Sequence, residues 1–427
     1  MIKYESHSGA VYNADNMEVL KSLPDNSIDS CVTDPPYGIS FMGKKWDYDV
    51  PSVELWKEVL RVLKPGGHIL VACGTRTQHR MVVNIEDAGF EIRDVISWVY
   101  GSGFPKSLNI GKAIDKIQGS QREIIATRVK SSQHGFKSDG VKHSGGVLGS
   151  IVDYTRGSSP YEGWGTALKP AVEFFTLVRK PISEKNIAEN VLKWGTGGIN
   201  IDGCRVDGPP PKVMGRGIKC EAWRKKEGRS DIEHNIIDFE QPSGRFPANF
   251  IHDGSDEVVR LFPETISGGG DKGNRRNGVG FFGNGKACNS NITTASQGSA
   301  ARFFYCAKAS PSERNEGLEG MPLGEPPASA RSKPAEGRKN ALGEPRANHH
   351  PTVKPLALMQ YLIRLITPPD GVVLDCFAGS GATGVAAVKE RKKYVLIERE
   401  EEYIKIIEAR VKHAESKIDP TLFDEVV

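Results

Sequence analysis

Near the start of the chain, Asp34-Pro35-Pro36-Tyr37 combines a carboxylate, two rigid prolines and an aromatic ring. The four residues follow an apolar run over 28–33 that is typical of a buried strand. A proline pair after such a run is common in turns. It also suits a reaction centre, because the Asp34 carboxylate and a proline carbonyl would accept both N–H donors of a planar amine while Tyr37 stacks on its ring.

A glycine-rich loop stands near the other end of the chain. Gly379, Gly381 and Gly384 follow an apolar run over 372–377 in a GxGxxG pattern, and Glu398 closes the next apolar run. Glycines let backbone approach a ligand closely, and an acid after the next strand accepts hydrogen bonds from ribose hydroxyls. The pattern fits both NAD and S-adenosylmethionine, and a tight turn without a ligand is the third interpretation.

Two features of this region favour S-adenosylmethionine over a dinucleotide. Too few residues follow Gly384 to complete a dinucleotide-binding domain. In addition, Asp375 stands just before the loop, where a carboxylate suits a cationic sulfonium and would repel a diphosphate.

Length and charge limit what surrounds these motifs. At 427 residues, the chain is long enough for a catalytic domain plus a second domain or a large insertion. With 57 Lys and Arg against 53 Asp and Glu, any nucleic-acid surface must come from local segregation of charge. The basic runs 106–142 and 212–229 are candidate phosphate-facing surfaces, or else solvated loops.

Several classes of protein are disfavoured by the sequence. It has neither a long apolar run nor a secretory signal, which predicts a cytoplasmic protein without a membrane span. The 7 cysteines contain no Cys-x-x-Cys pair, so we expect reduced packing residues. A metal site built from Cys204, Cys220, His234 and His252 is disfavoured by their scattered spacing, and no metal is expected.

Strand and helix patterns alternate at both ends of the chain. Strands are predicted over 28–33, 68–73, 90–100, 172–180, 372–377 and 394–398, with a turn at 64–67. Helices are predicted over 53–63, 77–88, 108–117, 351–366, 383–390 and 401–414. Such alternation indicates an α/β sheet with helices on both faces.

Between about 185 and 348 the chain shows no sustained period. This middle part contains a glycine-rich segment, 267–286, with Arg275 and Arg276, and a linker-like segment, 322–345. The simplest architecture is therefore one sheet built from the two ends, with the middle inserted.

The motifs and their order resemble those of the amino-group DNA methyltransferases of the β class. Asp34–Tyr37 matches the catalytic motif and Phe377-Ala-Gly-Ser-Gly381 matches the cofactor motif. Catalytic motif first, target-recognition region next and cofactor motif last is the circular permutation of that class. The resemblance covers about 10–100, 164–181 and 348–414, and shorter segments at 163–181, 195–203, 244–258 and 301–310 resemble a bacterial and prophage subgroup.

This resemblance implies a fold and a division of the chain. The expected fold is an α/β, class I S-adenosylmethionine-dependent methyltransferase (Rossmann-like) sheet, circularly permuted, with 172–180 as an antiparallel strand at its edge. Residues 1–185 would form the N-terminal half, with an insertion at about 103–163 that departs from the commoner pattern and is a candidate DNA contact. Residues 186–347 would form the target-recognition region and linker, and 348–427 the C-terminal half.

The resemblance also implies which residues act. The catalytic residues would be Asp34, Pro35, Pro36 and Tyr37. Asp15 would contact the cofactor adenine, and Thr352, Lys354 and Pro355 would lie near its methionine end. The cofactor set is completed by Asp375, Phe377, Gly379, Ser380, Gly381 and Glu398.

The implied activity is site-specific methyl transfer from S-adenosyl-L-methionine to N6 of an adenine flipped out of double-stranded DNA. Trp98 or Tyr100 would also stack on that base, unless Trp98 packs in the core. In the β class, Asp at the first catalytic position goes mostly with adenine and Ser with cytosine, so cytosine N4 methylation is the alternative. Two hypotheses from different classes are a silent DNA-binding protein and an NAD-dependent oxidoreductase. Expected partners are double-stranded DNA, a second copy of the chain and a cognate restriction endonuclease.

Overall fold

The computed structural model describes residues 2–39, 47–103, 107–129, 151–208, 244–267, 296–307, 310, 312–324 and 347–418. The chain divides into two compact units, one made of 1–101 with 172–427 and the other of 102–171. The basic run 212–229, the segment 268–286 with Arg275 and Arg276, Cys220 and His234 lie outside the described residues. So do parts of the basic run 106–142 and most of the linker-like segment 322–345.

In the described part of the larger unit, ten strands form one mixed sheet. Their order is β1 (Ile2–Ser6), β2 (Gly9–Asn13), β14 (Lys393–Glu398), β13 (Val372–Asp375), β3 (Ile28–Thr33), β4 (Leu63–Gly74), β8 (Val172–Arg179), β5 (Glu91–Val99), β9 (Phe250–His252) and β12 (Tyr305–Cys306). The strands from β2 to β4 are parallel, and β13 and β14 come late in the chain but lie beside β3 and β2. This arrangement confirms the expected α/β sheet built from the two ends of the chain.

The position of β8 differs from the expectation. The strand is antiparallel, but it lies between β4 and β5 and not at the edge of the sheet. The chain leaves the sheet at the end of β5. After 102–171 it re-enters at the same edge, and β8 therefore runs antiparallel to β5. The outer positions are taken instead by β9 and β12 on one side and by β1, paired antiparallel to β2, on the other.

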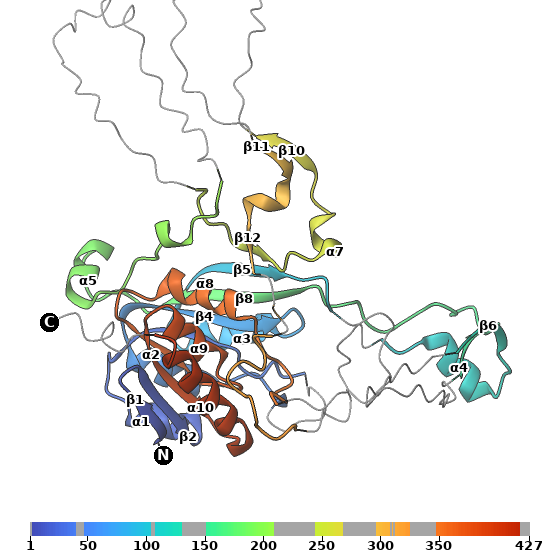
Figure 1. Cartoon of the computed structure of the whole chain (residues 1–427), viewed down its shortest axis with the longest axis horizontal. Coiled ribbons are helices and arrows are strands. Elements are labelled where there is room, and N and C mark those ends of the chain that lie inside the picture. The colour runs from blue at the N-terminus through green and yellow to red at the C-terminus, as the bar shows by residue number, and fades with distance from the viewer. Residues whose placement is uncertain are drawn as a thin grey trace, which may run out of the picture. The chain divides into compact units, whose positions relative to one another are not determined.

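Helices cover both faces of the sheet, as predicted from the alternating pattern. On one face pack α8 (Leu356–Ile366), α9 (Ala382–Lys389) and α10 (Glu401–Glu415), and on the other α1 (Asn16–Ser22), α2 (Val53–Val62) and α3 (Gln78–Asp87). Val32 and Leu70 face the first layer, whereas their neighbours Cys31 and Ile69 face the second, the two-residue alternation of a strand. The N-terminal elements, in blue, and the C-terminal elements, in red, thus share one body (Figure 1).

Two local predictions were wrong, and both errors involve proline or glycine. The helix predicted over 351–366 begins only at Leu356, because Pro355 disfavours helical backbone at Lys354. Residues 64–67, predicted as a turn, belong to β4, where the ladder to β3 shifts register and Gly66 has φ +80°.

Short elements that the sequence did not indicate complete the larger unit. They are β1, β2, α1, β9 and β12, together with α5 (Ile187–Trp194), α7 (Asp256–Val259), the hairpin-like pair β10 (Glu264–Ser267) and β11 (Ser296–Ser299), and two 3₁₀ turns, Asp202–Cys204 and Ala300–Phe303. Of the described cysteines, Cys306 is exposed and the other four are buried, all with free thiols. The described helices are all too short or too polar to span a bilayer.

Within its described residues, the smaller unit contains α4 (Ile110–Gln118) and the antiparallel pair β6 (Glu123–Val129) and β7 (Ile151–Arg156). Arg122 holds it together: its guanidinium donates to the buried Asp115, to Glu162 at 2.7 Å and to the carbonyl of Thr155 at 3.0 Å. A helix at 108–117 was predicted and is confirmed, while the two strands were not predicted.

Candidate active site

The predicted site residues gather at one edge of the sheet. Asp34 follows β3, Asp375 ends β13 and Glu398 ends β14, and because these strands are parallel their carboxyl ends lie at the same edge. Asp15 follows β2, which is parallel to β14. Since β8 runs the opposite way, its second residue, Glu173, reaches this edge as well.

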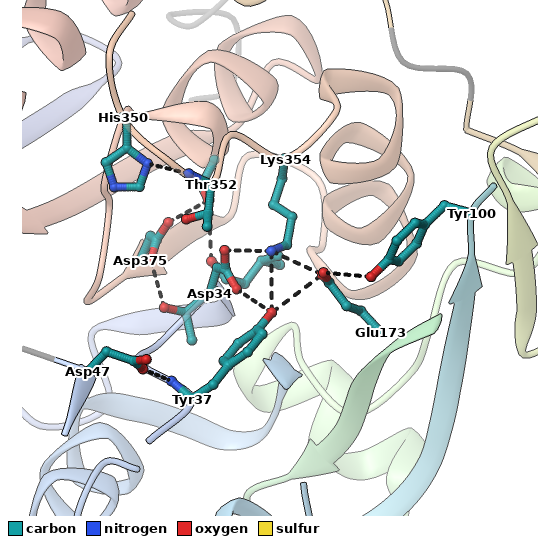
Figure 2. A network of polar contacts seen from close by, with 12 residues as sticks. Asp34, Tyr37, Asp47, Tyr100, Glu173, His350, Thr352, Lys354 and Asp375 are labelled. Atoms are coloured by element: carbon teal, nitrogen blue, oxygen red, sulfur yellow. Dashed lines mark hydrogen bonds and ion pairs between the residues drawn. The ribbon is translucent and has the colours of Figure 1, made fainter. Parts of the chain in front are cut away.

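Five side chains, Asp34 among them, form one polar cluster (Figure 2). The Lys354 ammonium lies 2.6 Å from Oδ2 of Asp34, 3.1 Å from Oε2 of Glu173 and 3.3 Å from the Tyr37 hydroxyl. That hydroxyl donates to Oδ1 of Asp34 at 2.8 Å, and the Tyr100 hydroxyl donates to Oε1 of Glu173 at 3.3 Å. We call these five residues the Asp34 cluster.

The Asp34 cluster is largely shielded from water. The exposed side-chain fraction is 9% for Lys354, 18% for Asp34 and 20% for Glu173. Burial raises the pKa of Asp34, an effect that Lys354 opposes and Glu173 reinforces. Burial alone would lower the pKa of Lys354, but the two carboxylates outweigh it and raise that pKa, so Lys354 stays charged.

The loop that carries Asp34 is fixed by a further carboxylate. Oδ1 of Asp47 accepts hydrogen bonds from the backbone N–H groups of Tyr37, at 2.6 Å, and Gly38, at 2.9 Å. Asp47 is 1% exposed, and Gly38 has φ +66°, which favours glycine. The Tyr37 ring lies over Gly74 at the end of β4, where a Cβ would come within 3.1 Å of the ring.

Asp375 links the two ends of the chain. Its Oδ1 accepts from the Thr33 hydroxyl at 2.7 Å and from the Phe377 N–H at 3.1 Å, and its Oδ2 accepts from the Thr383 hydroxyl at 2.5 Å. Burial raises the pKa of Asp375 to about 6, against these three donors. The carboxylate predicted to hold the cofactor therefore also joins β3 to the start of α9.

The glycine loop turns sharply over Glu398. Gly379 and Gly381 have φ of +54° and +75°, and the Gly379 N–H donates to Oε2 of Glu398 at 2.8 Å. The Glu400 N–H donates to Oε1 of Glu398 at 2.8 Å, and burial raises the pKa of Glu398 to about 7. Gly384 lets α9 pack on β14, because a Cβ there would lie 2.4 Å from Leu396.

A buried cation supports the same loop from behind. Arg410 of α10 is 2% exposed and donates to the Ser380 carbonyl at 2.6 Å and to its hydroxyl at 3.2 Å. Burial lowers the pKa of Arg410 to about 10. The carbonyl and the hydroxyl oxygen of Ser380 thus both accept from Arg410.

The remaining predicted residues have these positions. Asp15 is exposed and caps α1 by accepting from the Met17 N–H at 2.9 Å, while Thr352 is exposed and its N–H donates to Nδ1 of the buried His350 at 3.4 Å. Pro355 is the N-cap of α8, Phe377 is half-buried, and Pro35 and Pro36 connect Asp34 to Tyr37. Lys354 contacts the catalytic motif, although the resemblance placed it with the cofactor residues.

Sequence reasoning missed three residues of this site, Asp47, Glu173 and Arg410, and the polar role of Tyr100. Tyr100 was one of two further candidates to stack on a base, which stays a prediction, and its hydroxyl contacts Glu173. Trp98, the second stacking candidate, is 9% exposed in the core, with its ring 4.8 Å from that of Tyr100. The available signal was the acid Glu173 at the head of a strand that is mostly apolar as far as Val178.

The chemistry of this edge fits S-adenosylmethionine. It presents the carboxylates of Asp34, Glu173, Asp375 and Glu398 beside a glycine loop. Such an acidic edge suits a sulfonium and an ammonium and disfavours a diphosphate. The described residues contain no group of three or more His, Cys, Asp or Glu able to hold a metal ion.

Comparisons with known proteins agree with this chemistry. The family model N6_N4_Mtase, described as DNA methylase, matches residues 28–183 and 283–409, well over half of the chain. Type II methyltransferase M.BglII of Bacillus subtilis is 28% identical over 183 residues, 38% of this chain and 49% of that protein. DNA adenine methyltransferase YhdJ of Escherichia coli K12 is 45% identical over 58 residues, 14% of this chain and 20% of that protein.

Among solved structures, the PvuII DNA methyltransferase, described as cytosine-N4-specific, aligns with a TM-score of 0.42 and 15% identity, covering 100% of this chain and 98% of that one. The chain spans at most about half the length of the curated relatives named here. The ranges matched by the family contain both Asp34–Tyr37 and the glycine loop. The chain therefore belongs to the DNA methylase family.

Proposed function

We propose that the chain is an S-adenosylmethionine-dependent DNA methyltransferase of the β class that methylates N6 of adenine in double-stranded DNA. One observation carries the proposal: the Asp34 motif and the glycine loop with Glu398 lie at the same edge of one sheet. The hydrogen bond of 2.7 Å from Thr33 to Asp375 ties the two motifs together. An acceptor for an amine and a loop for the methyl donor are thus held side by side.

Bound S-adenosylmethionine would supply an electrophilic methyl group: the nitrogen takes this group as the S–CH3 bond breaks, the thioether S-adenosylhomocysteine leaves, and the nitrogen loses one proton to water. Asp34 would accept one N–H of the amine, and the Pro35 or Pro36 carbonyl the second, which directs the nitrogen lone pair. Both oxygens of Asp34 already have one donor each, from Tyr37 and Lys354, and each keeps a further lone pair. Positive charge that develops on the nitrogen is stabilised by the carboxylate.

Tyr37 would stack on the flipped base. Its backbone is fixed by Asp47 and its hydroxyl by Asp34, so the ring has little freedom to turn. A ring ordered before the base arrives loses less conformational entropy on binding.

The remaining roles extend the proposal to further residues. Glu398 would accept the ribose hydroxyls, Asp15 and Phe377 would contact the adenosine, and Thr352 and Pro355 would lie near the methionine end. The part of 186–347 that leaves the sheet would read the target sequence, and the unit 102–171 would contact DNA. A second copy of the chain and a cognate restriction endonuclease are proposed partners.

The choice of base rests on Asp34 as the first residue of the catalytic motif. Cytosine N4 is the second candidate, since the two amines present the same donors to the site. A relative is named as adenine-specific and a structural neighbour as cytosine-N4-specific, so their names favour neither base.

Transfer of tritiated methyl groups to unmethylated genomic DNA tests the activity. The wild-type chain should label DNA, and Asp34→Ala should not, while calorimetry should show S-adenosylmethionine binding to both. Labelling by Asp34→Ala at the wild-type rate would contradict the assignment of Asp34. Calorimetric binding of NAD in place of S-adenosylmethionine would favour an oxidoreductase.

A further inference from the structure

Glu173 is a carboxylate in the Asp34 cluster that the proposed transfer does not use. Its Oε2 lies 3.1 Å from the Lys354 ammonium and 3.4 Å from the Tyr37 hydroxyl, and its Oε1 is 3.3 Å from the Tyr100 hydroxyl. Placing a second negative charge beside a shielded carboxylate is unfavourable unless a cation compensates. Lys354 supplies that compensation, but it is one cation for two acids.

The Lys354 ammonium interacts with three groups of the Asp34 cluster. An ammonium has three N–H donors, and three acceptors surround it: Oδ2 of Asp34, Oε2 of Glu173 and the Tyr37 hydroxyl. Burial, followed by the nearby carboxylates, raises the pKa of both Tyr37 and Tyr100, so both phenols remain neutral. Two carboxylates and one ammonium therefore give the cluster one net negative charge.

We propose that Glu173 is a positioning residue for methyl transfer, which shares the Lys354 ammonium so that this cation does not neutralise Asp34 alone and the cluster keeps one net negative charge for the incoming amine. This inference rests on the function proposed above. If Lys354 paired with Asp34 alone, the pair would be neutral and a poorer partner for charge that develops on nitrogen. With Glu173 present, Lys354 also keeps two acceptors when the amine engages Asp34.

The same contacts fix the direction in which the pKa of Asp34 responds to substitution. Burial raises it, Lys354 lowers it and Glu173 raises it. Removal of the Glu173 charge should therefore lower the pKa of Asp34, and removal of the Lys354 charge should raise it. A residue that only filled space at this position would leave the pKa of Asp34 unchanged.

Four proteins test the proposal: wild type, Glu173→Gln, Lys354→Met and the double variant. Single-turnover transfer of tritiated methyl to unmethylated genomic DNA should slow on the order of tenfold or more in Glu173→Gln, with cofactor affinity by calorimetry within about twofold. The double variant regains the net charge of the wild-type cluster. Its transfer rate should therefore fall by less than the product of the two fold-losses measured in the single variants. A loss of rate in the double variant equal to that product would overturn the proposal.

The second readout does not depend on activity. With ¹³C-carboxyl-labelled aspartate and Asp34→Asn for assignment, NMR titration should show the Asp34 pKa falling in Glu173→Gln and rising in Lys354→Met. An unchanged pKa in Glu173→Gln would overturn the charge sharing, whether or not methyl transfer is found. Absence of transfer by the wild type would instead contradict the proposed function.

Glu390→Gln is the matched control. Glu390 is 11% exposed and bonded to Arg364 at 2.6 Å, so its loss removes a comparably shielded ion pair outside the Asp34 cluster. This variant should keep the wild-type transfer rate and the wild-type pKa of Asp34. A fall equal to that of Glu173→Gln would show that the loss of any shielded ion pair slows the reaction, which would overturn the proposal.

Discussion

The Lys354 ammonium lies 2.6 Å from Oδ2 of Asp34, although 320 residues separate the two along the chain. The contact joins the segment before α8 to the loop after β3, so the catalytic motif is completed by the opposite end of the protein. Thr33 and Asp375 make a second such connection, 342 residues apart. The site therefore depends on the permuted sheet and exists only when both ends have folded together.

Asp47→Ala should loosen the loop that carries Asp34. The substitution removes the acceptor of the Tyr37 and Gly38 N–H groups, and we expect a loss of about 2 kcal/mol in the free energy of unfolding. Methyl transfer should slow more than cofactor binding weakens, because Asp47 contacts the catalytic motif and not the glycine loop. Denaturant unfolding, single-turnover rates and calorimetry measure the three quantities. Equal losses of rate and cofactor affinity would contradict this role.

Cofactor binding should depend on pH through Glu398, whose folded pKa is about 7. Ribose hydroxyls donate more strongly to an ionised carboxylate, so affinity should rise with pH, by up to about tenfold per unit below pH 7. Calorimetry at pH 6, 7 and 8 should show this slope in the wild type and a flatter one in Glu398→Gln. Identical slopes in the two proteins would rule out Glu398 as the titrating group.

The raised pKa of Glu398 also makes the stability of the protein without ligand depend on pH, and this stability falls as the pH rises. The folded pKa of Glu398 lies above its ordinary value of 4.5, so the folded state binds the proton more tightly than the unfolded state. This contribution to stability is complete below about pH 4.5 and is lost as the pH rises through about 7. Thermal unfolding of Glu398→Gln should lack that part of the pH dependence; unfolding midpoints that follow the wild type across this range would disprove it.

Arg410→Met should weaken cofactor binding without touching the cofactor. The change leaves the Ser380 carbonyl without its buried donor, at a cost of about 1–3 kcal/mol in stability, and frees the glycine loop. Arg410→Lys keeps one donor and should fall between Arg410→Met and the wild type. Lys412→Met, on the exposed side of the same helix, is the control and should match the wild type. Unaltered cofactor affinity in Arg410→Met would show that the loop holds its shape unaided.

Much of the fold was predictable because the two ends of the chain have strong periodicity. Apart from β2 and α1, which no pattern indicated, the strands of the parallel core and the helices on both faces agree with the sequence patterns, and Asp34 and Glu398 lie at strand ends as expected. The order of the strands in the sheet could not be predicted as well from the sequence. A pattern of apolar residues marks 172–180 as a strand but does not show that it runs between β4 and β5, which is what brings Glu173 to Asp34.

The partners of the site residues were also hidden from the sequence. Asp47 and Arg410 act through backbone groups that any residue type presents, so no spacing rule reveals them. Lys354 was assigned to the cofactor by resemblance, and only the tertiary structure places its ammonium on Asp34. Side-chain partners set by long-range packing need coordinates, whereas the motif residues themselves can be read from the chain.

Mass spectrometry of nucleosides is the sharpest test of adenine methylation through Asp34. DNA lacking methylated bases is incubated with S-adenosylmethionine and either the wild-type chain or Asp34→Ala, then digested to nucleosides. We expect N6-methyladenine with the wild type and none with Asp34→Ala. N4-methylcytosine in its place would contradict the choice of base, and no methylated nucleoside at all would contradict the proposed activity.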